Sequence, residues 1–283
     1  MHLQNFNLKD PCRNKYRNEG DKMKKTIELG AVHINVNDLE KMKTYYENLG
    51  FISRHTEEGV ELSAGDRTLL VLHPTNHTRR HEVGLYHFAI LLPSRADLGN
   101  FLYHIAVNKI SVTGFSDHHV SEAIYLSDPE GNGIEVYRDK PEEDWKVDQK
   151  IHMTTEPMDV EGVLASRSTD SFDRFPQGTT MGHIHLHVLN LEDSDKHYKE
   201  SIGLEKMLDY PMAGFFSRDG YHHHVGMNMW LQGNPKAKED GYPGINHFTV
   251  HLEESVFDSF FPNETQVERR DPNNILYKVY RGF

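Results

Sequence analysis

The sequence has little cysteine, no long apolar run and no excess of positive charge. Cys12 is the only cysteine among 283 residues, which excludes an intramolecular disulfide and a thiolate-rich metal site. No apolar run approaches the roughly 20 residues of a transmembrane helix, and the N-terminus lacks the apolar stretch of a secretory signal. The net charge of −12 opposes binding to nucleic acid or to an anionic membrane. We therefore expect a cytoplasmic protein with neither as a partner.

Histidine is the residue present in excess, with 20 copies against 31 lysines and arginines together. The histidines form no terminal tag, so their positions need an explanation. The remaining composition, 37% hydrophobic and 26% charged, is typical of a globular protein with a buried core. A length of 283 residues exceeds the roughly 100–200 residues of one domain, so we expect two.

The first periodic segment predicts a strand followed by a helix and three more strands. Residues 29–36 alternate as a strand does, and residues 38–49 follow a helical pattern with Asp38 as N-cap and Gly50 as the stop. Further strands are predicted at residues 51–54, 58–63 and 67–73.

This βαβββ unit recurs along the chain, which indicates an internal repeat. Residues 31–39 (AVHINVNDL) match 183–191 (HIHLHVLNL), and residues 85–92 (LYHFAILL) match 245–252 (INHFTVHL). We therefore expect an α+β fold of four βαβββ modules in two tandem halves. The predicted modules lie near residues 28–80, 84–140, 181–233 and 244–283.

The repeats also set the domain boundaries that we expect. Residues 1–26 carry no sustained period, and we interpret them as a mobile tail. The first half covers residues 27–140 and the second half covers residues 181–283, with two modules each. Residues 141–180 between them are rich in charge, Ser, Thr and Pro, as a linker is, and we expect them to be partly helical around 157–166. A homo-oligomer is compatible with this architecture.

Histidines open three of the four modules. His183 opens the third module, and His87 and His247 open the second and fourth, whereas the first module has Ala31 in the place of His183. Glu135 is the only carboxylate in the final strands of the four modules. Two imidazoles and one carboxylate on one face of a metal, with neighbouring positions open for substrate and dioxygen, are typical of non-haem Fe(II) oxygenases. A single strand histidine is more often a hydrogen-bonded residue of the sheet, but the matching positions of the set favour a metal site.

Several strings resemble the vicinal-oxygen-chelate superfamily, which has the glyoxalase/bleomycin resistance/extradiol dioxygenase fold: GHIHLHV, YHFAILL and DPEGNGIEVY. Within it, residues 181–188, 220–228 and 116–129 are similar to type I extradiol dioxygenases of the catechol 2,3-dioxygenase kind. The resemblance covers about residues 28–283. In that family the metal ligands are a His that opens one module, a His that opens its partner module, and a Glu on the partner's last strand.

Carried over to this chain, the resemblance implies His183 for the first ligand, His87 or His247 for the second, and Glu135 for the third. In the commonest extradiol pattern both His and Glu come from the C-terminal half, but the fourth module here offers no Glu. Only a pairing of the second module with the third completes a triad. The prediction is therefore His87, His183 and Glu135, with His247 as the substitute for His87.

The resemblance implies three further residues near the metal. Alternation puts His222 and His224 on one face of their strand, and His224 matches the acid–base histidine of the family. Tyr125 lies at the spacing from Glu135 of the family's substrate-contacting tyrosine, and His118 lies in a loop-like stretch that can reach the pocket. The alternative for His224 and Tyr125 is a packed, hydrogen-bonded place in the sheet.

The leading hypothesis is an Fe(II)-dependent extradiol dioxygenase that inserts O2 into a catechol-type aromatic diol, with Mn(II) as the other candidate metal. It predicts about one metal per chain. The first alternative is a glyoxalase-like metal-dependent lyase or isomerase, but no Asp or Glu between Tyr221 and Lys238 supplies the fourth ligand of such enzymes. The second alternative is a metal-free protein that binds an aromatic drug and confers resistance to it.

Overall fold

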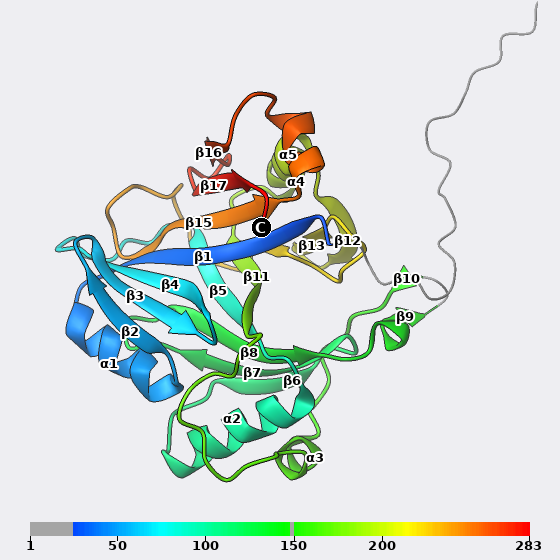
Figure 1. Ribbon diagram of the computed structural model, residues 1–283. Helices are drawn as coiled ribbons and strands as arrows, with labels where there is room; N and C mark the ends of the chain where they lie inside the picture. The colour runs from blue at the N-terminus through cyan, green and yellow to red at the C-terminus, as the bar shows by residue number, and fades with distance from the viewer. Residues whose placement is uncertain (1–24, 148–149) are drawn as a thin grey trace, which may run out of the picture.

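The computed structural model describes residues 25–147 and 150–283. The predicted tail lies outside the described residues, apart from its last two. Strands dominate the fold, and helices pack on the outside of the sheet (Figure 1). None of the described helices is both long and apolar enough to cross a membrane.

The first module confirms the predicted element order. It contains β1 (Ile27–Val36), α1 (Leu39–Leu49), β2 (Ile52–Thr56), β3 (Gly59–Ala64) and β4 (Arg67–Pro74). The Asp38 side chain accepts a hydrogen bond from the backbone N–H of Lys41 at the start of α1, as an N-cap does. Gly50 ends the helix with φ 107°, a backbone conformation that favours glycine.

The second and third modules repeat this order. The second contains β5 (Gly84–Leu91), α2 (Arg95–Val107), β6 (Gly114–Asp117), β7 (Ser121–Ser127) and β8 (Gly133–Asp139). The third contains β11 (Thr180–His187), α4 (Leu191–Ile202), β12 (Glu205–Tyr210), β13 (Ala213–Ser217) and β14 (Val225–Asn228).

The fourth module is shorter than predicted. It contains β15 (Gly244–Leu252), α5 (Glu254–Phe260), β16 (Gln266–Arg270) and β17 (Leu276–Arg281). Only a two-stranded hairpin follows its helix in the described residues, so it is βαββ and not βαβββ. The α+β fold of repeated modules is otherwise as expected.

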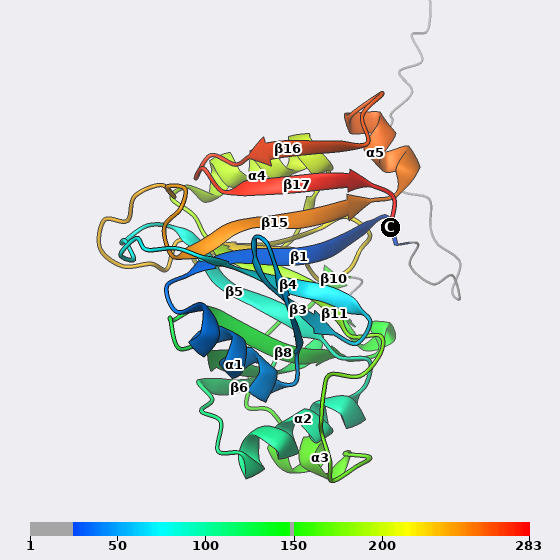
Figure 2. The same cartoon turned by 60° about the vertical axis from the view of Figure 1, so that its left-hand side comes forward.

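The modules pair across the two halves of the sequence. The continuous path through the sheet is β16-β17-β15-β1-β11-β5-β8-β7-β6, as Figure 2 shows for β17, β15, β1, β5 and β8. β1 pairs antiparallel with β15, and β5 pairs antiparallel with β11. The first module therefore pairs with the fourth and the second with the third, as the completeness of the triad predicts. The division into halves at residues 140 and 181 stays a prediction.

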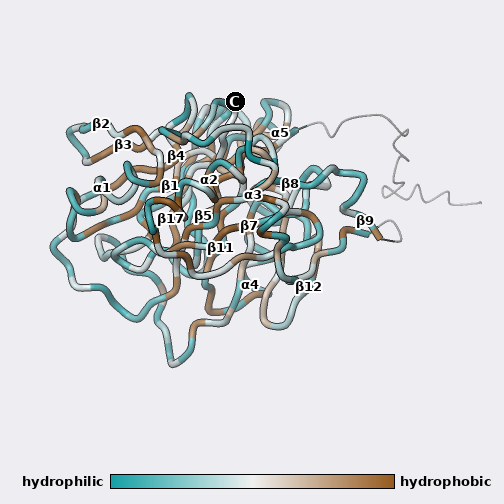
Figure 3. Tube along the Cα trace, turned by 90° about the horizontal axis from the view of Figure 1, so that it is seen from below, coloured by the Kyte–Doolittle hydropathy of each residue, from teal (hydrophilic) through white to brown (hydrophobic). Residues whose placement is uncertain are grey.

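In each half of the sequence, a buried tyrosine on a helix of one module forms a hydrogen bond to an aspartate of the next module. Tyr46 on α1 donates a hydrogen bond to Asp128 in the second module at 2.8 Å, and Tyr198 on α4 donates to Asp271 in the fourth module at 3.4 Å. Both tyrosines are fully buried. Hydrophobic residues concentrate along the central strands and hydrophilic residues along the outer loops (Figure 3).

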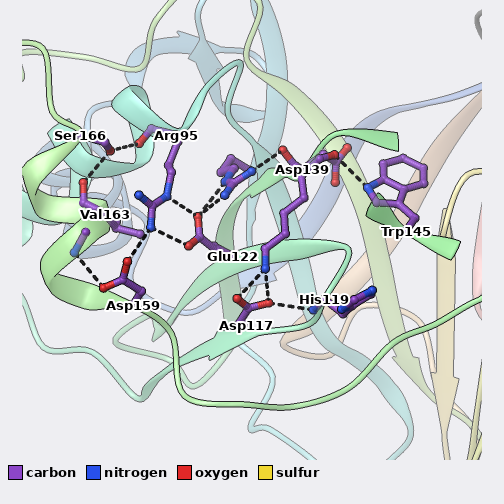
Figure 4. Close-up of polar contacts among 12 residues, drawn as sticks. Arg95, Asp117, His119, Glu122, Asp139, Trp145, Asp159, Val163 and Ser166 are labelled. Atoms are coloured by element: carbon purple, nitrogen blue, oxygen red, sulfur yellow. Dashed lines mark hydrogen bonds and ion pairs between the residues drawn. The ribbon is translucent and has the colours of Figure 1, made fainter. Parts of the chain in front are cut away.

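The linker is tied to the second module by ion pairs. It contains η1 (Glu142–Asp144), β9 (Lys146–Val147), β10 (Lys150–Ile151) and α3 (Val160–Ala165). Arg95 donates to both oxygens of the buried Glu122 at 2.9 Å and to Asp159 at the start of α3 at 3.1 Å (Figure 4). This contact holds the helical part of the linker against α2.

Candidate metal centre

Three adjacent strands bring His87, Glu135 and His183 together. β5 lies between β8 and β11, and its Ala89 is the register partner of both Glu135 and His183. Register partners on neighbouring strands point to the same face of a sheet, and the small Ala89 side chain leaves the space between them free. His87 lies two residues before Ala89 and therefore on the same face.

The three donor atoms form a nearly equilateral triangle. Nε2 of His87 and Nε2 of His183 are 3.4 Å apart, and each lies 3.1 Å from Oε2 of Glu135. A metal with bonds of about 2.0–2.2 Å holds the ligand atoms of one octahedral face roughly 2.8–3.1 Å apart. In the described part of the chain, this is the one group of at least three such side chains that could hold a metal ion.

The charges of this group also fit a divalent cation. Burial lowers the pKa of His183, so its imidazole is neutral at neutral pH and can offer a lone pair. Burial by itself raises the pKa of Glu135, but the neighbouring His183 and His87 hold it well below its usual range. The buried Glu135 carboxylate beside the neutral imidazole of His183 is a negative charge that a bound cation would compensate.

A cavity of about 480 Å³ opens on the triad. All three residues line it, together with His118, Tyr125, His185 and His223. A ligand inside this cavity can therefore reach the donor atoms.

The structure places Tyr125 and His118 next to each other in this cavity. Tyr125 on β7 is the register partner of Glu135, so it shares the face of the triad. Its hydroxyl lies 2.6 Å from Nε2 of His118, whose Nδ1 lies 2.7 Å from the carbonyl oxygen of Thr154. Because a carbonyl only accepts, Nδ1 carries the proton and Nε2 accepts from the Tyr125 hydroxyl. Burial raises the pKa of Tyr125 well above its usual value, so the hydroxyl keeps its proton at neutral pH.

The structure does not bring His224 to the triad. His224 lines a separate cavity of about 230 Å³, and its Nδ1 lies 2.9 Å from the hydroxyl of Ser217. The ring that lies against His183 is that of His223, at 4.1 Å between centroids, and His223 lines the larger cavity. His223, and not His224, therefore lies beside the triad, where His224 was expected.

The reason for this difference is a bend before β14. The strand begins only at Val225, and residues 221–224 are irregular. Strand alternation therefore does not apply to the three histidines at 222–224. The histidine run was the signal in the sequence, but which ring faces the cavity depends on this bend.

His222 and Asp139 extend from His223 in a chain of hydrogen bonds. Nδ1 of His222 lies 2.8 Å from Nδ1 of His223, and Nε2 of His222 lies 2.8 Å from Oδ1 of Asp139. A carboxylate only accepts, so Nε2 of His222 donates to Asp139. In neutral His222, Nδ1 then accepts the Nδ1–H of His223, which leaves the lone pair of His223 on Nε2. Burial lowers the pKa of His223 well below its usual value, so its neutral form dominates at neutral pH.

His247 lies in the other pair of modules and is not near the triad. Its ring stacks on that of His33 at 3.8 Å between centroids. Nδ1 of His33 in turn lies 2.9 Å from Nε2 of His73. The structure therefore places His247 in a separate histidine cluster, where it cannot substitute for His87.

In this second cluster a lysine stands at the register position that corresponds to Glu135. Thr249 on β15 is the partner of Lys278 on β17, just as Ala89 is the partner of Glu135. Lys278 thus occupies the place that Glu135 has at the triad. A cation in this place opposes the binding of a metal.

Comparison with known proteins gives the class. A family profile described as Glyoxalase/Bleomycin resistance protein/Dioxygenase superfamily matches residues 28–136. A catechol-2,3-dioxygenase of Bacillus subtilis (strain 168) is 39% identical over 235 residues, which are 79% of this chain and 82% of that protein. The chain therefore belongs to the glyoxalase/bleomycin resistance/dioxygenase superfamily. Through this homology it is an oxidoreductase of the dioxygenase type.

Solved structures share the fold. Glyoxalase I from Zea mays aligns with a TM-score of 0.53 at 13% identity, over 90% of this chain and 92% of that one. The cppA protein from Streptococcus pneumoniae TIGR4 aligns with a TM-score of 0.53 at 12% identity, over 90% and 98%. At these identities the likeness shows the architecture alone.

Proposed function

We propose that the protein is an Fe(II)-dependent extradiol dioxygenase that inserts both atoms of O2 into a catechol-type aromatic diol. The observation that carries this proposal is the buried triangle of His87, His183 and Glu135 at the wall of a cavity. Its support from homology is the relationship to a catechol-2,3-dioxygenase. Iron, when bound by these three side chains, supplies a Lewis-acidic and redox-active site where diol and O2 meet. Mn(II) fits the same donors.

His223 handles the proton of the diol in this proposal. Nε2 of His223 accepts a hydroxyl proton when the diol binds and returns it when the ring opens, because the neutral ring lines the cavity and offers a free lone pair on Nε2. His222 and Asp139 hold the tautomer of His223 that leaves Nε2 free. These two residues act through His223 and are positioning residues.

Tyr125 and His118 orient the diol. The Tyr125 hydroxyl is a protonated donor that shares a face with Glu135, so it can turn from His118 to an oxygen of the substrate. His118 is fixed by its bond to the Thr154 carbonyl and limits how far the hydroxyl can move.

The two alternatives fit the site less well. A glyoxalase-like lyase needs a fourth protein ligand, whereas the candidate group in the described residues has three. A metal-free binding protein has no use for a carboxylate buried between His87 and His183, because desolvation of the carboxylate is costly without a cation.

The test is ring cleavage by the metal-loaded protein. The protein is loaded anaerobically with Fe(II) or, separately, with Mn(II), mixed with catechol and exposed to air. We expect about one metal per chain, a yellow ring-fission product, and one O2 consumed for each product formed. Absence of product with both metals, in protein that holds a full equivalent of metal, would contradict the proposal.

A further inference from the structure

An aromatic wall extends the cavity beyond the triad. It consists of Tyr86, Leu208, Tyr210, Phe215 and Trp230, which come from β5, β12, β13 and the segment after β14. None of these residues belongs to the candidate metal centre or to the groups that handle its proton. The wall is therefore available to contact the part of a substrate that does not react.

The wall presents apolar surface. The indole N–H of Trp230 donates to the carbonyl of Pro211 at 3.1 Å, so its polar atom is already bonded within the protein. Tyr86 and Tyr210 pack edge-on against the Trp230 ring at 5.7 and 6.3 Å between centroids. Tyr86 is nonetheless 40% exposed and Tyr210 47% exposed. Large aromatic side chains left uncovered at a cavity are a typical binding surface for an apolar group.

The cavity has no cationic partner for an anionic group. Among the described residues that line it there is no Lys or Arg, and Glu135 is the only one that carries a negative charge. The whole chain carries a net charge of −12. A carboxylate on the substrate would lose part of its hydration against this wall and gain no ion pair with a Lys or Arg, which is unfavourable.

The volume of the cavity indicates the size of the ring substituent that it can accept. About 480 Å³ lies within the roughly 300–1,000 Å³ of sites that bind drug-sized ligands, and it is more than a single six-membered ring fills. The geometry points to catechols with a neutral, apolar substituent of several carbons as the substrate class, and against catechols with a carboxylate. This inference rests on the proposed function and adds the substituent to it.

Three probes test the inference. They are catechol itself, 4-(3-methylbutyl)catechol and 3-(3,4-dihydroxyphenyl)propanoate, of which the last two have the same shape and differ in charge. We expect kcat/KM for the methylbutyl compound to exceed that for catechol by at least about 10-fold, because its methylene groups become buried. We expect the propanoate to be at least about 10-fold poorer than catechol. Their affinities are measured in parallel by anaerobic calorimetry on the iron-loaded protein.

A matched pair of variants locates the selectivity. Leu208→Arg adds a cation to the wall and should raise the ratio of propanoate to methylbutyl turnover by at least about 10-fold. Leu189→Arg makes the same change at an exposed leucine (44% exposed) outside both cavities, and the ratio should stay within about twofold.

The outcomes separate this inference from the proposed function. If catechol is cleaved and the propanoate is turned over as well as the methylbutyl compound, the inference is wrong and the function stands. If no probe is cleaved but calorimetry keeps the expected order of affinities, the function is wrong and the inference about the wall stands. Without cleavage and without this order, both fail.

Discussion

At the scale of single residues, Glu135 carries the negative charge of the candidate centre. Glu135→Gln keeps the size of the side chain but removes the anionic oxygen. We expect iron affinity to fall by at least about 100-fold, because a lost ligand should cost more than the 10- to 100-fold loss typical of groups that merely support ligands. Ring cleavage should fall with it. Competition with a chelator under anaerobic conditions measures the affinity.

The histidines provide the control for this experiment. His87→Ala should lose iron as Glu135→Gln does, whereas His247→Ala should keep it within about twofold, because His247 stacks on His33 in the other pair of modules. Loss of iron in His247→Ala together with its retention in His87→Ala would place the centre in that other pair.

Asp139 is predicted to act on the reaction through His222 and His223. Asp139→Ala removes the acceptor for Nε2 of His222, so His223 should lose its single tautomer and kcat should fall by about 10- to 100-fold with little change in KM. Asp139→Asn keeps an oxygen that can accept the same bond and should retain more activity. Nitrogen-15 NMR of the His223 ring reads the tautomer directly. An unchanged tautomer in a folded Asp139→Ala protein would rule this role out.

At the scale of elements, local chemistry predicts most of the strands and helices. Asp38 and Gly50 bound α1 in the structure as they do in the sequence pattern, because an N-cap and a left-handed glycine act within one turn. The His87, Glu135 and His183 group was also predictable, since repeat-equivalent positions report which side chains share a face. His223 was not, because it depends on the bend at residues 221–224, which no period in the sequence marks.

The strand register predicts how a second metal centre could be created. Lys278 stands in the place of Glu135, and Ala31 stands in the repeat position of His183. The double variant Ala31→His and Lys278→Glu should therefore complete a triad with His247 and raise the metal content from about one towards two per chain. Lys278→Glu alone lacks one imidazole and should stay near one.

Elemental analysis after anaerobic loading measures this content, and circular dichroism confirms that the double variant is folded. A folded double variant that still binds one metal would show that the two pairs of modules are not equivalent at these positions.

At the scale of the whole molecule, the pairing of modules across the halves fixes where the centre can form. The backbone ladders of β5 with β11 and of β1 with β15 join segments about a hundred or more residues apart, which local propensity cannot specify. The sequence pointed to this pairing only because one combination of modules completes a triad. The expected set of metal ligands thus predicted that the second module pairs with the third. The hydrogen bonds between β5 and β11 are the physical basis of that pairing.

The buried histidines predict how stability depends on pH. Burial lowers the pKa of His33 to about 3, that of His247 to about 4 and that of His224 to about 3, whereas in the unfolded chain each has its ordinary value near 6.5. Between about pH 6.5 and pH 4 the unfolded chain therefore binds protons that the folded protein does not. Stability is fully present above pH 6.5 and is lost as the pH falls through this window, by up to about 1.4 kcal/mol per pH unit for each histidine.

Urea unfolding of the metal-free protein at pH 7, 6 and 5 measures this loss. His224→Gln retains a group that can bond to Ser217 and cannot take up a proton, so the slope of unfolding free energy against pH should decrease by about one histidine's share. Cys12→Ser, which changes no group that titrates in this range, should leave the slope as it is. A free energy of unfolding that is the same at pH 7 and pH 5 would mean that these imidazoles are accessible to protons in the folded protein, contrary to their burial.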